Sequence, residues 1–92
     1  MLFVVLLKAR PGTVQERIER RLEWEAPKEG AQPIAEYWLQ TPDPAVIVAC
    51  EADHIGQLWT SFGAWNDLFD ITMFPAITAE EGLELLKQAS QE

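Results

Sequence analysis

Residues 2–9 of the chain read LFVVLLKA, a stretch in which aliphatic and β-branched side chains occupy odd and even positions alike. A strand with one face in water alternates apolar and polar residues, so this pattern predicts a strand that is covered on both faces. Residues 45–52, AVIVACEA, have the same character and predict a second strand of this kind. Both strands belong in the centre of a sheet.

Two further segments predict strands at the edges of the same sheet. Residues 34–40, IAEYWLQ, carry Glu36 and Gln40 on one parity, and residues 70–77, DITMFPAI, carry Pro75. Proline cannot donate a ladder hydrogen bond, which confines it to an edge or to a strand end. These segments are therefore less enclosed than the central pair.

Helices are predicted in the remaining segments. Thr13 with Glu16, and Thr78 with Glu81, each match a capping box, in which two side chains bond reciprocally to backbone amides of the first turn. Asp53 is expected to cap the middle helix.

Each helix has an apolar stripe at helical spacing that is expected to face the core. The other side of the first helix carries Arg17, Arg20 and Arg21 among glutamates, which predicts a solvated face with local ion pairs. An anion site at these arginines is the alternative. The stripes consist of Val14, Ile18 and Leu22 in the first helix, Ile55, Leu58, Trp59, Phe62, Trp65 and Phe69 in the second, and Ala79, Leu83 and Leu86 in the third.

The element order is thus β-α-β-β-α-β followed by a C-terminal helix, in one domain over residues 1–92. This order predicts an α+β, ferredoxin-like fold with a four-stranded antiparallel sheet. In that topology the first and third strands are central and the second and fourth lie at the edges. The apolar patterns of the four segments agree with this arrangement independently.

The composition excludes several classes of partner. Fifteen acids against seven Lys and Arg give a net charge of −8, which repels phosphate, so neither nucleic acid nor an anionic membrane is expected as a partner. The single cysteine, Cys50, lies in an apolar run, where packing is favoured over reactivity. The initial MLFVVLL is too short to span a bilayer and lacks signal-peptide features, so a cytoplasmic protein is expected.

Residues 54–70, HIGQLWTSFGAWNDLFD, hold the sole histidine and two of the four tryptophans, but no recognisable catalytic set. No metal site is expected because the ligand types do not cluster, and no cofactor is implied. Pockets in such folds lie between sheet and helices and are mainly apolar. A small apolar or aromatic molecule is the expected ligand, and the candidate lining residues are Tyr37, Trp38, His54, Trp65 and Asp67.

A homodimer is expected from the two central strands. Helices on one face of a ferredoxin-like sheet leave the other face open, yet both parities of these strands are apolar. The C-terminal helix is long enough to cover only part of that face. A second copy packed through the sheet would cover the rest.

The run WNDLFDITMFPAIT, residues 65–78, resembles a motif of a bacterial family known as a domain of unknown function, and the resemblance extends to MLFVV, to the Trp38 strand and to CEADH. It implies a ferredoxin-like domain similar to the dimeric α/β-barrel proteins. Relatives of that type include cofactor-independent monooxygenases and isomerases. This implies an enzymatic alternative to ligand binding, with His54 or Asp67 as the proton-transfer group.

Overall fold

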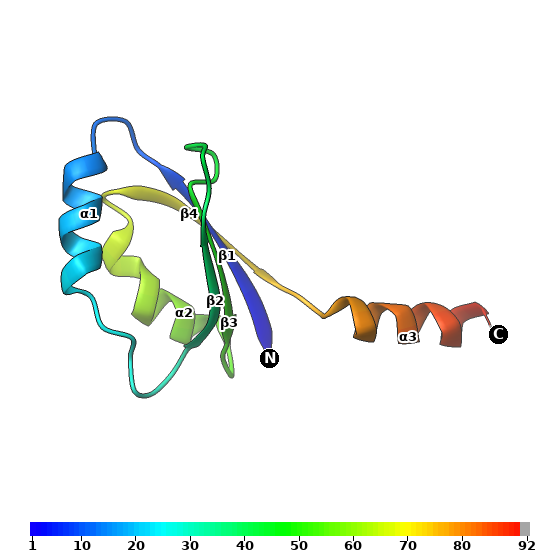
Figure 1. Ribbon diagram of the computed structural model, residues 1–92. Helices are drawn as coiled ribbons and strands as arrows, with labels where there is room; N and C mark the ends of the chain where they lie inside the picture. The colour runs from blue at the N-terminus through cyan, green and yellow to red at the C-terminus, as the bar shows by residue number, and fades with distance from the viewer. Residues whose placement is uncertain (91–92) are drawn as a thin grey trace.

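The computed structural model of the protein describes residues 1–90 (Figure 1). The elements follow the order β1 (Leu2–Ala9), α1 (Val14–Glu23), β2 (Gln32–Trp38), β3 (Val46–Glu51), α2 (Ile55–Phe62), the 3-10 helix η1 (Gly63–Trp65), β4 (Phe69–Pro75) and α3 (Ala79–Ser90). The strands form one antiparallel sheet in the order β2-β3-β1-β4. The ferredoxin-like α+β fold with an added C-terminal helix is therefore confirmed, with β1 and β3 in the centre.

Helices α1 and α2 lie on one side of the sheet (Figure 1). The core lies on that side, because a helix stripe and a sheet face each bury their apolar surface against the other. The central strands supply one wall of the core and α2, η1 and the start of β4 supply the other. The largest contributors are Phe3, Val5, Leu7, Val48, Cys50, Leu58, Phe62, Trp65, Leu68 and Phe69.

The two faces of the sheet differ in burial. In β1, Phe3, Val5 and Leu7 are buried towards the helices, whereas Val4 and Leu6 point to the opposite side and stay partly exposed. By register, Val4 lies between Ala49 of β3 and Phe74 of β4. We call the side opposite to α1 and α2 the open face; it is formed by Leu2, Val4, Leu6, Ala35, Tyr37, Ile47, Ala49, Thr72 and Phe74, with the charged Lys8, Glu51 and Asp70 at the strand ends.

Helix α3 projects away from the body on the side of the open face (Figure 1). The radius of gyration is 15.4 Å, whereas a compact chain of this length has about 12 Å. Contrary to expectation, α3 covers no part of its own sheet, and Leu83, Leu85 and Leu86 are each more than half exposed. Within residues 1–90, no helix is both long and apolar enough to cross a membrane.

One of the two predicted capping boxes forms. The Glu81 amide donates to Thr78 Oγ1 (3.1 Å) and the Thr78 amide donates to Glu81 Oε1 (3.4 Å), as predicted. At α1 the prediction is wrong, because Thr13 Oγ1 instead donates to the Arg10 carbonyl (2.7 Å).

The predicted cap of the middle helix is also wrong. The residue before α2 is His54, so it occupies the capping position, although no side-chain cap bond forms. The Asp53 carboxylate accepts a hydrogen bond from Gln57 Nε2 instead (3.4 Å). Local side-chain bonding of an aspartate competes with capping in this way.

The orientation of α1 differs from the prediction, because the aliphatic stripe lies beside the buried side of the helix and not on it. Val14, Ile18 and Leu22 are 58, 51 and 81% exposed, and no residue of α1 is fully buried. The arginine side faces the body instead. Its aliphatic stems supply apolar contact while the guanidinium groups reach acids and aromatic rings on other elements.

The stripe predicted for the middle helix is only partly correct. Leu58, Phe62 and Trp65 are buried, but the α-helix ends at Phe62 and the chain continues as η1. Ile55 and Trp59 are about half exposed, and Phe69 belongs to β4. The early end of the helix turns the chain back into the sheet and puts Trp65 and Phe69 against each other, with ring centroids 6.1 Å apart.

Candidate functional site

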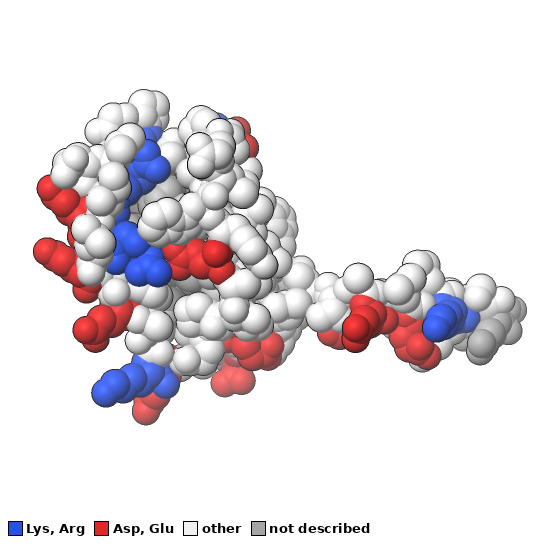
Figure 2. Space-filling model, viewed as in Figure 1, with Lys and Arg blue, Asp and Glu red and all other residues white. Residues whose placement is uncertain are grey.

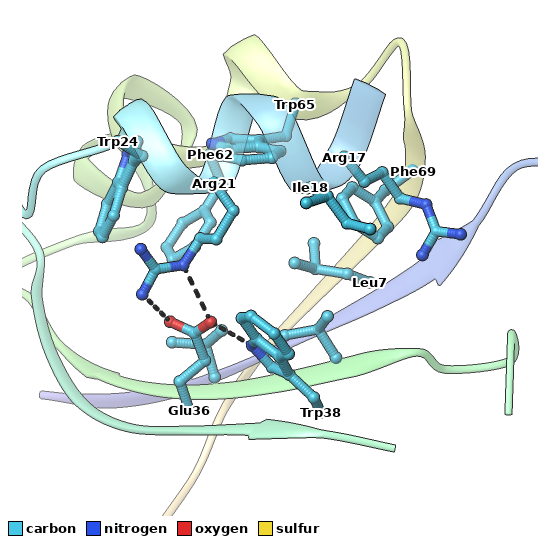
Figure 3. Close-up of a pocket in the computed structure, with 12 residues that line it drawn as sticks. Leu7, Arg17, Ile18, Arg21, Trp24, Glu36, Trp38, Phe62, Trp65 and Phe69 are labelled. Atoms are coloured by element: carbon cyan, nitrogen blue, oxygen red, sulfur yellow. Dashed lines mark hydrogen bonds and ion pairs between the residues drawn. The ribbon is translucent and has the colours of Figure 1, made fainter. Parts of the chain in front are cut away.

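A cavity of about 140 Å³ lies between α1 and the sheet (Figure 3). Its walls are mainly aromatic and aliphatic, and two arginines and one glutamate are the charged groups among them. Trp38 is 67% exposed and Ile18 51%, so the cavity opens to solvent between α1 and the edge strand β2. The lining residues are Leu7, Arg17, Ile18, Arg21, Trp24, Glu36, Trp38, Val46, Val48, Phe62, Trp65 and Phe69.

A hydrogen-bond network forms one corner of the cavity. Arg21 reaches across from α1 and donates through Nε and Nη2 to the two carboxylate oxygens of Glu36, at 3.2 Å each (Figure 3). The indole nitrogen of Trp38 donates to the same carboxylate at 2.5 Å. Glu36 and Trp38 share a side of β2 because side chains two apart in a strand point the same way. The network thus orients the indole over the cavity.

The ionised form of Glu36 is favoured by this network. Partial burial by itself would raise the pKa of the carboxyl, but the hydrogen bonds from Arg21 and Trp38 and the charge of Arg21 outweigh it, so the pKa lies below the usual value of 4.5. Glu36 therefore acts as a fixed acceptor and not as a proton reservoir.

The lowered pKa of Glu36 predicts a pH-dependent stability difference. The ionised carboxylate stabilises the folded state above its ordinary pKa of 4.5, and this contribution is lost as the pH falls through the lower folded value. The free energy of unfolding of the wild type should therefore exceed that of Glu36→Gln at about pH 6, and the difference should shrink towards about pH 3. Urea unfolding of both proteins across this range measures it.

The matched control for this experiment is the same comparison in an Arg21→Met background. Without the guanidinium the pH dependence of the difference should be smaller. A difference between wild type and Glu36→Gln that stays constant with pH would contradict the assignment.

Each arginine on the inner side of α1 stacks on an aromatic ring. The Cζ atoms of Arg17, Arg20 and Arg21 lie 5.7, 5.6 and 5.0 Å from the ring centroids of Phe69, Trp65 and Trp24 respectively. Such contacts attract the cation to the negative ring face. They account for the inward position of the arginine side of α1.

Arg20 fixes α1 to the segment that leads into β4. Its two Nη groups donate to both carboxylate oxygens of Asp67, at 2.7 and 2.9 Å, and one of them also donates to the Ala64 carbonyl. The hydrogen bonds from Arg20 lower the pKa of Asp67. Asp67 is therefore an anchoring group for the helix.

The structure brings together two of the five predicted site residues. Trp38 and Trp65 both line the cavity. Tyr37 points to the open face, where it is 61% exposed. Neither His54, which is exposed before α2, nor Asp67 is among the lining residues.

The lining residues predicted from the sequence did not include Arg17, Arg21 or Glu36. A signal for Glu36 was present, because it lies two residues before Trp38 in a strand and so shares its side. For the arginines an anion site was only the alternative, since a run of mixed charge on a helix normally faces water.

Cys50 packs in the core, fully buried, and burial raises the pKa of its thiol to about 11. Within residues 1–90, no cluster of three or more His, Cys, Asp or Glu side chains is placed to hold a metal ion.

Comparison with known proteins yields a family but no characterised relative. No curated protein and no solved structure matches the chain significantly. A family described as a domain of unknown function (DUF3303) matches residues 1–90, which is nearly the whole chain and includes every element of the fold and of the cavity. The chain therefore belongs to the DUF3303 family.

Proposed function

We propose that this protein is a homodimeric binding protein that takes a small apolar or aromatic molecule into the cavity between α1 and the sheet. The observation that carries the proposal is the aromatic and aliphatic wall of this cavity, with its hydrogen-bonded corner at Glu36. Ligand sites typically combine apolar walls with a few convergent polar groups.

The size of the cavity limits the ligand. Its volume is about 140 Å³, close to that of an engineered apolar cavity of about 150 Å³ in another protein that binds benzene. The aromatic rings around it favour a flat partner, which they contact edge-on or by offset stacking. A single six-membered ring fits, and larger groups would extend through the opening beside Trp38.

Filling the cavity should abolish this binding. Val46 lines the cavity from β3, and Val46→Phe would occupy the space of the ligand ring. We expect its affinity for single-ring compounds such as benzyl alcohol and benzamide to fall at least tenfold, which is about 1.4 kcal/mol. Titration calorimetry, with the change in intrinsic tryptophan fluorescence as a second readout, measures the loss.

Leu22→Phe is the matched control, because Leu22 is 81% exposed and is not among the residues that line the cavity. It should bind as the wild type does. If Val46→Phe, shown to be folded by circular dichroism, keeps wild-type affinity, the cavity is not the binding site. If the wild type binds none of these compounds at millimolar concentration, the proposed ligand class is wrong.

The dimeric part of the proposal rests on the open face. Its central side chains are aliphatic, and its two edges carry the exposed rings of Tyr37 (61%) and Phe74 (49%). Soluble monomers rarely leave such a continuous apolar patch in water. Two sheets packed face to face about a two-fold axis would cover it.

Helix α3 adds to the surface that a partner can cover. Four strands about 4.8 Å apart and seven residues long present a face of roughly 19 by 23 Å. The area of this face is smaller than the roughly 800 Å² that each partner buries in a stable interface. Helix α3, which carries the exposed Leu83 and Leu86, projects on the side of the open face (Figure 1). A partner that contacts both surfaces would bury more area than the open face offers by itself.

Sedimentation equilibrium at micromolar concentration tests the oligomeric state. We expect a species of two chain masses and a thermal midpoint that rises with protein concentration. A folded species of one chain mass would refute the dimer.

A further inference from the structure

We propose that the ligand of the cavity is a single-ring aromatic carboxylate whose carboxylate group is bound by Arg17. This inference rests on the proposed function and names the chemical class of its ligand. Two observations support it: the net positive charge of the residues that line the cavity, and the Arg17 guanidinium, which has no acidic partner within residues 1–90.

The cavity is a positively charged site on an acidic protein. The whole chain has a net charge of −8, whereas the lining contains two arginines and one glutamate, a balance of +1. Figure 2 shows Lys and Arg side chains gathered along α1 beside a hollow in the surface. A local reversal of charge favours an anionic ligand at this one place.

Arg17 has binding capacity that the other arginines of α1 lack. Arg20 is paired with Asp67 and Arg21 with Glu36. Arg17 Nε donates to Thr13 Oγ1 (3.0 Å), and within residues 1–90 neither of its Nη groups has an acidic partner. Thr13 and the ring of Phe69 hold the guanidinium, which extends past Phe69 at the end of the cavity far from Glu36 (Figure 3).

The two ends of the cavity impose one orientation on the ligand. Arg17 and Arg21 are one helical turn apart, about 6 Å along the axis. At the Arg21 end, Glu36 neutralises the charge of the Arg21 guanidinium, and its carboxylate repels a second one. The carboxylate of the ligand therefore belongs at the Arg17 end. The ring then lies between Leu7, Trp38 and Trp65 (Figure 3). A guanidinium binds a carboxylate through two parallel hydrogen bonds.

A monoanion suits this site better than a phosphate ester. One free guanidinium neutralises one charge, and the nearby carboxylate of Glu36 and the acidic surface both disfavour a dianion. The carboxylate is therefore the favoured anionic group.

Calorimetric titrations of the full chain with benzoate, benzamide and acetate test the inference. Benzamide has the same ring without the charge, and acetate has the charge without the ring. We expect benzoate to bind about 10- to 100-fold more tightly than benzamide, because hydrogen bonds to charged groups are stronger than neutral ones. Benzoate affinity should fall with added salt while benzamide affinity does not, and acetate should not bind measurably.

In Arg17→Met the affinity for benzoate should fall to that for benzamide. The affinity for benzamide should stay within about twofold of the wild-type value. Arg10→Met is the matched control, since it removes one positive charge that pairs with Asp70 outside the cavity; it should change neither affinity. Two results would overturn the role of Arg17 and leave the proposed function standing. One is that the wild type binds benzoate and benzamide with equal affinity. The other is that Arg17→Met loses affinity for both compounds by the same factor. Absence of binding by both ring compounds overturns the proposed function itself.

Discussion

Phe74→Asp is expected to convert the proposed dimer into folded monomers. Phe74 lies on the open face, beside Val4 in the register of β4 and β1, and 49% of its surface is exposed in the single chain. In a two-fold interface the substitution places two carboxylates in apolar surroundings. An unpaired buried charge costs several kcal/mol, so the dissociation constant should rise at least about 100-fold.

Trp59→Asp provides the matched control for this experiment. Trp59 is an aromatic residue of equal exposure, 49%, but it lies on α2 on the other side of the sheet. It should leave the mass of the assembly unchanged in sedimentation equilibrium. Tyr37→Asp, at the opposite edge of the open face, should weaken the dimer as Phe74→Asp does.

The same experiment separates a dimer through the open face from other assemblies. Circular dichroism establishes that each variant is folded, which is expected because these side chains lie outside the core. If Phe74→Asp and Tyr37→Asp both remain dimeric, the interface lies elsewhere on the molecule.

Leu58→Ala is expected to have the largest effect on stability. Leu58 is fully buried on the side of α2 that packs on the sheet. Truncating a buried leucine removes its transfer free energy and leaves a cavity, at a cost of about 2–5 kcal/mol. A domain of this size has a free energy of unfolding of only about 5–15 kcal/mol, so much of the stability would be lost.

Urea unfolding at one fixed protein concentration measures the effect of Leu58→Ala. Leu22→Ala makes the same chemical change at a side chain that is 81% exposed, and such surface changes stay within about 0.5 kcal/mol. A loss below about 1 kcal/mol for Leu58→Ala would mean that α2 does not pack on the sheet as described.

The site residues illustrate what a sequence pattern can reveal about a cavity. Trp65 was predicted on the core-facing stripe of the middle helix, whereas Trp38 was a candidate because the chain is rich in aromatic side chains, although Glu36 and Gln40 share its parity. Tyr37 shows the limit of that reasoning, since its neighbour Trp38 points the other way. One position along a strand exchanges the two faces. Trp38 shares its parity with Glu36 and Gln40, and Tyr37 lies on the other parity, so the pattern of this edge strand does not say which face the helices cover.

The strands, their order and the C-terminal capping box were determined by the sequence itself, because each depends on residues close together or on a pattern within one segment. LFVVLLKA and AVIVACEA are central because both of their parities are apolar, although the helices of the chain cover only one of their two faces. The orientation of α1 was decided only by tertiary structure. Within the helix, the aliphatic stripe of Val14, Ile18 and Leu22 is the better candidate for burial, but Arg20 finds its partner 47 residues away at Asp67 and Arg21 finds Glu36 on a different strand. Long-range pairs and stacked rings outweighed the local pattern, and they formed the charged cavity as a result.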